Sequence, residues 1–162
     1  MMALAQWLSE TPASLAIRNV DWLVPLLQTI HILAIAMVIS SVFMIDLRIL
    51  RVVKLQSMTD TAHRFVPWIW AGLGLLAASG AMLIVSEPQR ALPNPAFQIK
   101  MSLLALAIAT TCAFQISLRR NAAFWDDAGP KRLLTHGLAL TSFALWCAIA
   151  LAGRLIAYMQ PG

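Results

Sequence analysis

Three ionisable residues lie within long apolar segments of this sequence. They are His31 in LLQTIHILAI, Lys100 in FQIKMSLL and Arg154 in LAGRLIAY. An ionisable side chain is costly inside a membrane, so each is a candidate functional residue. His31 is the most informative, because a neutral imidazole can bind a metal ion or haem iron. A structural histidine bonded to a neighbouring backbone carbonyl is the alternative, and the residues leave both interpretations open.

Lys100 and Arg154, together with Gln28 and Tyr158, fall at the same predicted end of the protein as His31. If these side chains gather, they form a partly apolar, cationic pocket. Such a pocket suits a flat apolar molecule with a negative edge: a porphyrin with its propionates, a quinone or a lipid phosphate. Either cation could instead extend to the lipid headgroups. The predicted cofactor-binding residues are therefore His31, Lys100, Arg154, Gln28 and Tyr158, with His31 as the metal ligand.

The other two histidines, His63 and His136, belong to the opposite end. Helical rise places His31 about 12 Å below one membrane surface and His136 about 5 Å from the other. Two axial ligands of one haem must lie at nearly equal depth, so His31 and His136 cannot bind the same iron. His63 and His136 are interpreted as ordinary water-exposed histidines, and a metal or haem site shared by the two is the alternative. The haem hypothesis therefore has His31 as its single protein ligand.

The elements that position these residues are four long apolar segments. The chain has 162 residues, 60% hydrophobic and 12% charged, whereas a soluble domain carries about 25% charged residues. Each segment is long enough to cross a hydrocarbon core of about 30 Å as a helix. The sequence predicts an all-α fold: one integral membrane domain over 1–162, an antiparallel four-helix bundle with a short N-terminal interfacial helix. The predicted spans are 23–45, 66–85, 96–118 and 133–158.

Local patterns add details. Thr11-Pro12 is predicted to cap and start a short helix, and Pro67 is predicted to open the second span. The third span is predicted to start after the Pro93-Asn94-Pro95 turn. Gly74 begins a series of small residues spaced four apart, which predicts close helix contacts. Further pairs of this kind are Ala77 with Ala81, Ala105 with Ala109, and Ala144 with Ala148. Asp46 and Arg48 are expected to pair at the end of the first span.

Basic residues are distributed unequally between the two sides. The connections after the first and third spans hold eight Lys or Arg residues, and the other side holds four. The positive-inside rule then predicts a multi-pass protein of the bacterial inner membrane with both termini in the periplasm. The formal charge of +5 sits at the span ends, with no basic face interleaved with aromatics. Nucleic-acid binding is therefore not expected.

The segments QTIHILAIAMVISSVFMIDLR, FQIKM and GRLIAY resemble an uncharacterised family of bacterial four-span membrane proteins over nearly the whole chain. More distantly, the first-span histidine and third-span lysine are similar to those of copper-resistance D type membrane domains and bacterial membrane-bound protoporphyrinogen oxidases. In the oxidases the matching histidine is a haem ligand and the matching lysine is required. The resemblance implies these roles for His31 and Lys100. The fourth span lacks the oxidases' Asn-Glu-x-Pro pattern, so fold and site location are implied more than a reaction.

The leading hypothesis is a membrane-embedded redox protein that binds haem b at His31. A copper or other metal-handling protein is the first alternative, in which His31 acts with thioether or thiol ligands. A non-catalytic subunit or lipid-binding bundle is the second. The bilayer is the expected partner, and a membrane-protein partner or a homo-oligomer stays open. Candidate soft ligands are Met37, Met44, Met82, Cys112 and Cys147.

Overall fold

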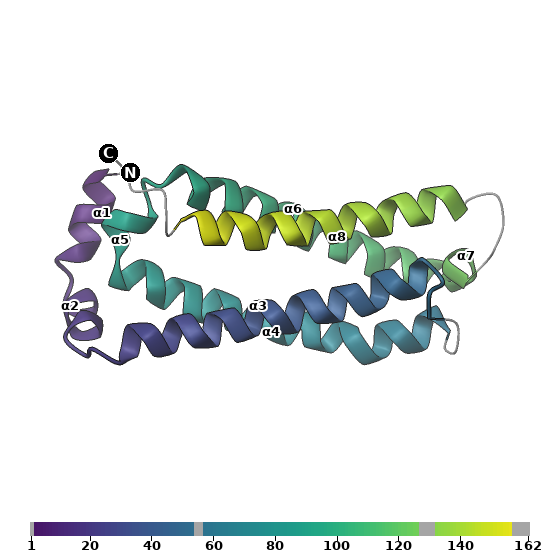
Figure 1. Cartoon of the computed structure of the whole chain (residues 1–162), viewed down its shortest axis with the longest axis horizontal. Helices are drawn as coiled ribbons and strands as arrows, with labels where there is room; N and C mark the ends of the chain where they lie inside the picture. The colour runs from purple at the N-terminus through teal and green to yellow at the C-terminus, as the bar shows by residue number, and fades with distance from the viewer. Residues whose placement is uncertain (1, 54–56, 127–131, 157–162) are drawn as a thin grey trace.

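Four long helices make up most of the protein (Figure 1). The computed structural model describes residues 2–53, 57–126 and 132–156. Four of the helices are long and apolar enough to cross a membrane, which confirms the predicted all-α four-helix class. The long helices are α3 (Leu23–Ile49), α4 (Met58–Ser86), α6 (Pro95–Arg120) and α8 (Arg132–Leu155). The short ones are α1 (Met2–Ser9), α2 (Pro12–Arg18), α5 (Pro88–Ala91) and α7 (Ala122–Asp126).

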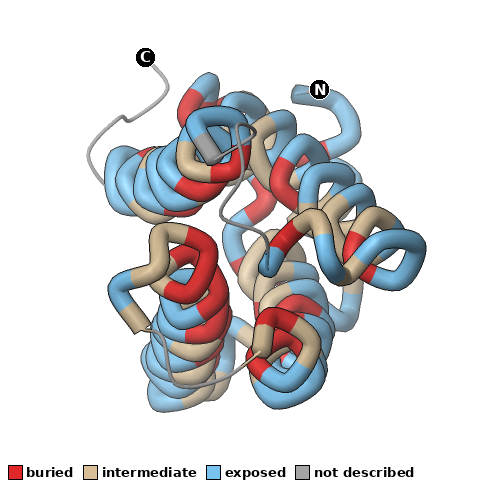
Figure 2. Tube along the Cα trace, turned by 90° about the vertical axis from the view of Figure 1, so that its right-hand side faces the viewer, coloured by how far each residue is buried: buried red, intermediate tan, exposed pale blue. Residues whose placement is uncertain are grey.

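The long helices run antiparallel, in two pairs. α3 packs along α4, while α8 packs against both α6 and α3. An end-on view shows the buried face of each long helix turned toward the others and its exposed face turned outward (Figure 2). The short helices α1, α2 and α5 lie across one end of the bundle, here called the cap end. The other end, where α7 lies beside the α3–α4 connection, is called the far end.

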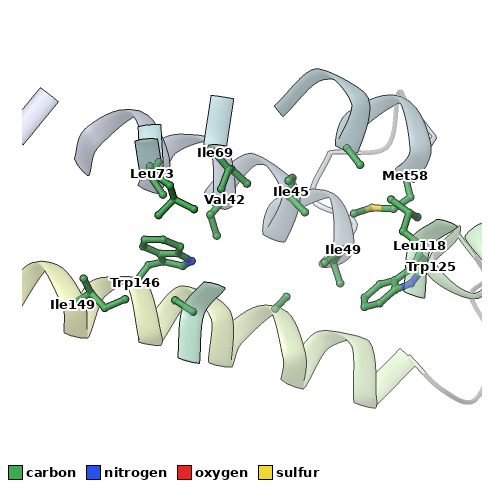
Figure 3. Close-up of a cluster of buried hydrophobic side chains, with 14 residues drawn as sticks. Val42, Ile45, Ile49, Met58, Ile69, Leu73, Leu118, Trp125, Trp146 and Ile149 are labelled. Atoms are coloured by element: carbon green, nitrogen blue, oxygen red, sulfur yellow. The ribbon is translucent and has the colours of Figure 1, made fainter. Parts of the chain in front are cut away.

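A hydrophobic core lies in the middle of the bundle and extends along its far half (Figure 3). Trp146 of α8 is 3% exposed and packs toward α3 and α4 near Val42 and Leu73. Trp125 of α7 lies beside Leu118 in the far half of the same cluster. These two large aromatics supply much of the apolar surface that is buried between the helices. The core therefore links all four long helices and α7.

Two predicted helix starts are confirmed and one is wrong. Thr11 caps α2 by accepting a hydrogen bond from the Ser14 backbone N–H, and Asn94 caps α6 through Ala96. The second span does not open at Pro67, because α4 begins at Met58 and Pro67 lies inside it. Ser57 caps α4 by accepting from the Asp60 N–H. This strong cap starts the helix two turns early, and the proline removes only one backbone donor.

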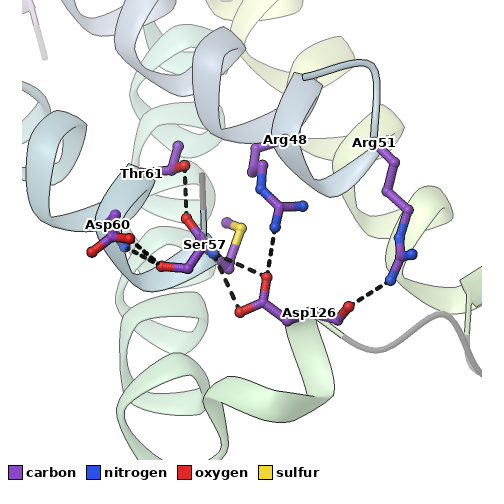
Figure 4. Close-up of polar contacts among 7 residues, drawn as sticks. Arg48, Arg51, Ser57, Asp60, Thr61 and Asp126 are labelled. Atoms are coloured by element: carbon purple, nitrogen blue, oxygen red, sulfur yellow. Dashed lines mark hydrogen bonds and ion pairs between the residues drawn. The ribbon is translucent and has the colours of Figure 1, made fainter. Parts of the chain in front are cut away.

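The far end is held together by Asp126, which lies at the C-terminal end of α7 (Figure 4). Its Oδ1 accepts from Arg48 Nη2 at 2.7 Å and from the Met58 backbone N–H at 3.0 Å. Arg48 therefore pairs with Asp126 and not, as predicted, with Asp46. The reason is helical geometry: residues two apart on a helix do not face each other. The carboxylate also stabilises the positive N-terminal end of α4.

α3 ends with a backbone reversal at Arg51, whose φ is 60°. The Val52 N–H bonds the Leu47 carbonyl and the Arg51 N–H bonds the Arg48 carbonyl, which is the Schellman arrangement. A non-glycine residue in this conformation is strained by about 1 kcal/mol. The Arg51 side chain offsets that strain by donating to the Asp126 backbone carbonyl at 2.6 Å. The turn that starts the α3–α4 connection is thus tied to α7 (Figure 4).

The small residues predicted to make close helix contacts are the wrong ones. Gly74 is exposed and a Cβ added there would meet no atom within 4 Å. The close contact is made by Gly72, where a Cβ would lie 2.5 Å from Val38 Cγ2 and 3.5 Å from the Ala34 carbonyl oxygen. Several series with a spacing of four coexist on an alanine-rich helix, and spacing alone does not say which one faces a neighbour. The other predicted positions are exposed as well, apart from Ala148, which is half-buried.

Gly72 and Gly74 provide a matched test of this packing. Gly72→Leu is expected to destabilise the bundle by about 1–3 kcal/mol, because the new side chain must displace Val38 and separate α3 from α4. Gly74→Leu faces open space and is expected to change stability little, or to raise it slightly through helix propensity. Thermal unfolding in detergent measures both variants. Equal melting temperatures for the two variants would contradict the close α3–α4 contact.

Candidate functional site

All four long helices contribute to one polar cluster near the cap end. His31 of α3 lies between Ser79 of α4 and Lys100 of α6. Its Nδ1 is 2.8 Å from Ser79 Oγ, and its Nε2 is 3.4 Å from Lys100 Nζ. Gly153 of α8 completes the cluster, because a Cβ there would lie 3.3 Å from Lys100 Nζ. We call His31, Ser79 and Lys100 the polar triad.

The residue counts along the helices explain why these side chains lie at one depth in the bundle. His31 is eight residues from the start of α3 and Ser79 seven from the end of α4, which is about 12 Å and 10 Å from the cap end. Lys100 is five residues into α6, about 7 Å deep, and its long side chain spans the remaining distance to the imidazole. The chain thus places three polar side chains at one depth within an otherwise apolar bundle.

The hydrogen bonds define the tautomer of His31. Ser79 Oγ donates its only proton to the Leu75 carbonyl at 2.7 Å. It can therefore only accept from the imidazole, so Nδ1 carries the proton and donates to Ser79. In the neutral ring, Nε2 is then left with its lone pair and accepts from the Lys100 ammonium. A histidine held through one nitrogen, with the lone pair of the other presented to a cation, is preorganised as a ligand.

Two glycines make room for the polar triad. A Cβ at Gly80, the residue after Ser79, would lie 3.3 Å from His31 Cε1, and one at Gly153 equally close to Lys100 Nζ. Both distances are tighter than ordinary contacts, so any larger residue would push on the imidazole or the ammonium. The space that these side chains occupy exists because both neighbouring positions lack a side chain.

A family model matches residues 22–159 of the chain, which includes all four long helices. The chain belongs to the family of unknown function DUF6644. No curated protein and no solved structure matches the chain. The similarity to copper-resistance D type domains and protoporphyrinogen oxidases is not shown by these comparisons, so it stays a prediction.

The DUF6644 chain brings together two of the five predicted cofactor-binding residues. His31 and Lys100 are in contact. Gln28, on the same helix as His31, is exposed, and Arg154 is exposed beside Gly153. Tyr158 lies outside the described residues. Below His31, the face of α3 packs against α4, since Gly72 lies against Val38 and Ala34.

The remaining histidines are separate from the polar triad. His63, five residues into α4, is exposed as predicted. His136, near the start of α8, is half-buried, and its Nε2 is buried without a hydrogen-bond partner among the described residues. The prediction of a water-exposed His136 is therefore wrong. Both residues lie at the end of their helix that faces away from the cap end.

Sequence reasoning missed Ser79, Gly80 and Gly153. A signal was present for the first: Ser79 is a polar residue in the second span at nearly the depth of His31, and equal depth on two spans is the condition for contact. The glycines carried no such signal, because a glycine in an apolar helix is equally compatible with lipid, as Gly74 demonstrates.

The described residues contain no group of three or more His, Cys, Asp or Glu side chains that could hold a metal ion. Among the predicted soft ligands, Cys147 and Met44 are exposed and Met37 packs against Gly72. The site therefore offers a metal one imidazole nitrogen, at His31. That donor set suits an ion that brings its other ligands with it, as haem iron does.

Proposed function

We propose that this protein is a membrane-embedded redox protein that binds haem b, or a related metalloporphyrin, with His31 as its single protein ligand. The observation that carries the proposal is the 2.8 Å contact between His31 Nδ1 and Ser79 Oγ, whose own proton has the Leu75 carbonyl as acceptor. We infer from it that Nδ1 carries the proton and that the Nε2 lone pair is left for iron. Metal-binding histidines are typically oriented in this way by a second hydrogen bond. The bound group would supply one-electron redox chemistry.

Lys100 supports the same proposal through its charge. Its ammonium lies 3.4 Å from His31 Nε2, so it must release that nitrogen when iron binds. The lysine side chain lies along Gly153, and an ammonium that has left the imidazole can pair with a propionate. The exposed Arg154 follows Gly153 directly and offers a second cation to the same ligand. A porphyrin with carboxylates matches both charges.

A copper-handling protein is supported less well. Cu(I) prefers thiolate and thioether ligands, whereas the polar partners of His31 among the described residues are the Ser79 hydroxyl and the Lys100 ammonium. A non-catalytic subunit or lipid-binding bundle would use the polar triad only as a structural connection between helices. In that case Lys100 would bind a lipid phosphate or simply hold α6 against α3.

The absorption spectrum of the purified protein tests the proposal. Protein purified from cells supplied with ample haem precursor is expected to show a Soret band and visible bands that change on reduction with dithionite. Metal analysis of the same sample should give iron and not copper. A protein that shows no Soret band, and takes up no haem when haemin is added in detergent, contradicts the proposal.

The proposal includes a location. Eight of the twelve basic residues follow the first and third spans, which places the far end of the bundle in the cytoplasm, and the cap end and both termini in the periplasm. The polar triad then lies in the outer leaflet of a bacterial inner membrane. Alkaline phosphatase fused after Gly162 is expected to be active, and the same enzyme inserted after Asp126 inactive. The reverse pattern would place the site in the inner leaflet.

A further inference from the structure

A cavity of about 420 Å³ lies in the far half of the bundle, between α3, α6, α7 and α8. One wall is aromatic: Trp125 packs edge-on against Phe114 and Phe124, with ring centroids 4.9 and 5.4 Å apart. The volume is within the range of about 300–1,000 Å³ that is typical of small-molecule sites. The lining reaches the outer surface of the bundle, since Leu138 is 48% exposed and Thr141 is exposed.

The acidic residue Asp46 lines this cavity. It is 4% exposed, and its Oδ2 is buried without a hydrogen-bond partner among the described residues. Its carboxyl group has the Ser142 hydroxyl as a side-chain partner, while the neighbouring Arg48 is turned to Asp126. A buried carboxylate oxygen without a partner is costly in an apolar interior. The cavity therefore presents an acceptor that no described residue satisfies.

Most of the other polar side chains that line the cavity have their protons bonded elsewhere. Thr110 and Thr111 both donate their hydroxyl protons to the Ala107 carbonyl, and Thr141 donates to the Gly137 carbonyl. The indole N–H of Trp125, in the cavity wall, donates to Ser117 Oγ. With these protons already used, the walls can mainly accept hydrogen bonds. A ligand must therefore bring the donors.

We propose that this cavity binds a flat, apolar organic cation whose N–H group donates to Asp46. The aromatic wall and the apolar lining accept the ring system, and the carboxylate accepts the charge. This site is independent of the His31 cluster, because fifteen residues of α3 separate Asp46 from His31, about 22 Å along the helix. The exposed rim at Leu138 and Thr141 is the lipid-facing route by which such a molecule would reach it.

Two acridines of the same ring size test this inference. 9-Aminoacridine is a protonated N–H donor at mildly alkaline pH, whereas acridine is neutral and has no N–H group. With the protein in phosphatidylcholine nanodiscs, a fluorescence titration should show saturable binding of 9-aminoacridine, about tenfold or more tighter than acridine. Asp46→Asn keeps the shape of the side chain and removes its charge. It is expected to weaken 9-aminoacridine binding about tenfold or more and to leave acridine binding unchanged.

Two further variants complete the design. Ala139→Phe places a ring in the cavity, where Ala139 is 1% exposed, and should abolish binding of both acridines. Glu87→Gln changes an exposed acid at the cap end and should change neither. Melting temperatures establish that each variant is folded. Equal binding of 9-aminoacridine to the parent and Asp46→Asn, equal affinities of the two acridines for the parent, or no saturable binding at all would each overturn the inference.

Discussion

Replacement of His31 by alanine is expected to remove nearly all haem from the purified protein. Among the described residues, no histidine other than His31 lies at this depth of the bundle. In the alanine variant, Lys100 would have no ring nitrogen to contact. A salt link to a propionate is worth about 1–3 kcal/mol, far less than a direct bond to iron. The ratio of Soret absorbance to protein absorbance measures the loss.

Graded variants distinguish a ligand from a structural histidine. Ser79→Ala removes the partner that fixes the His31 tautomer and should weaken haem affinity about 10- to 100-fold while leaving some haem bound. Lys100→Ala should weaken retention partly, because it removes a charge and not the ligand. His63→Ala and His136→Ala change the other end of the bundle and should leave the spectrum intact. A Soret band that persists in His31→Ala but disappears in His136→Ala would place the haem in the far half.

Replacement of Asp126 by alanine is expected to cause the second largest effect, a loss of about 2–3 kcal/mol of stability. Asp126 joins three elements: α7, the end of α3 through Arg48, and the first turn of α4 through the Met58 N–H. The arginine side chain is only 11% exposed, so losing this partner costs more than losing a surface ion pair. Thermal or denaturant unfolding in detergent measures the change.

The chain provides a control for this effect in its other described ion pair. Glu87 and Arg90 lie 3.2 Å apart, but both side chains are nearly half exposed, so Glu87→Ala should cost less than about 1 kcal/mol. Asp126→Asn should lie between these values, because an amide oxygen can still accept from Met58 but has lost the charge. If Asp126→Ala is no worse than Glu87→Ala, the far end is not held together by this contact.

The amino-acid sequence by itself determined the class of fold and the number of spans, although α4 begins at Met58 and not near Pro67. Long apolar runs cannot be buried in a protein of this size, so their number and length give the number of spans, and caps such as Asn94 fix where helices begin. The sequence also identified His31 and Lys100, because ionisable residues in apolar segments are costly and therefore conspicuous. Counting along the helices also places both residues near the same end of the bundle.

Only the tertiary structure decided which face of each helix turns inward. Rotation about the helix axis depends on how all four helices pack together, and alanine-rich helices offer several faces of similar apolarity. This is why Gly72 and not Gly74 makes the close contact, and why Arg48 reaches Asp126 across 78 residues of sequence. The same rotation places Ser79 against His31 Nδ1. It also places Asp46 in the lining of the far-half cavity. Hydrogen-bond partners of this kind are properties of the assembled bundle, because each depends on the rotation of two helices at once.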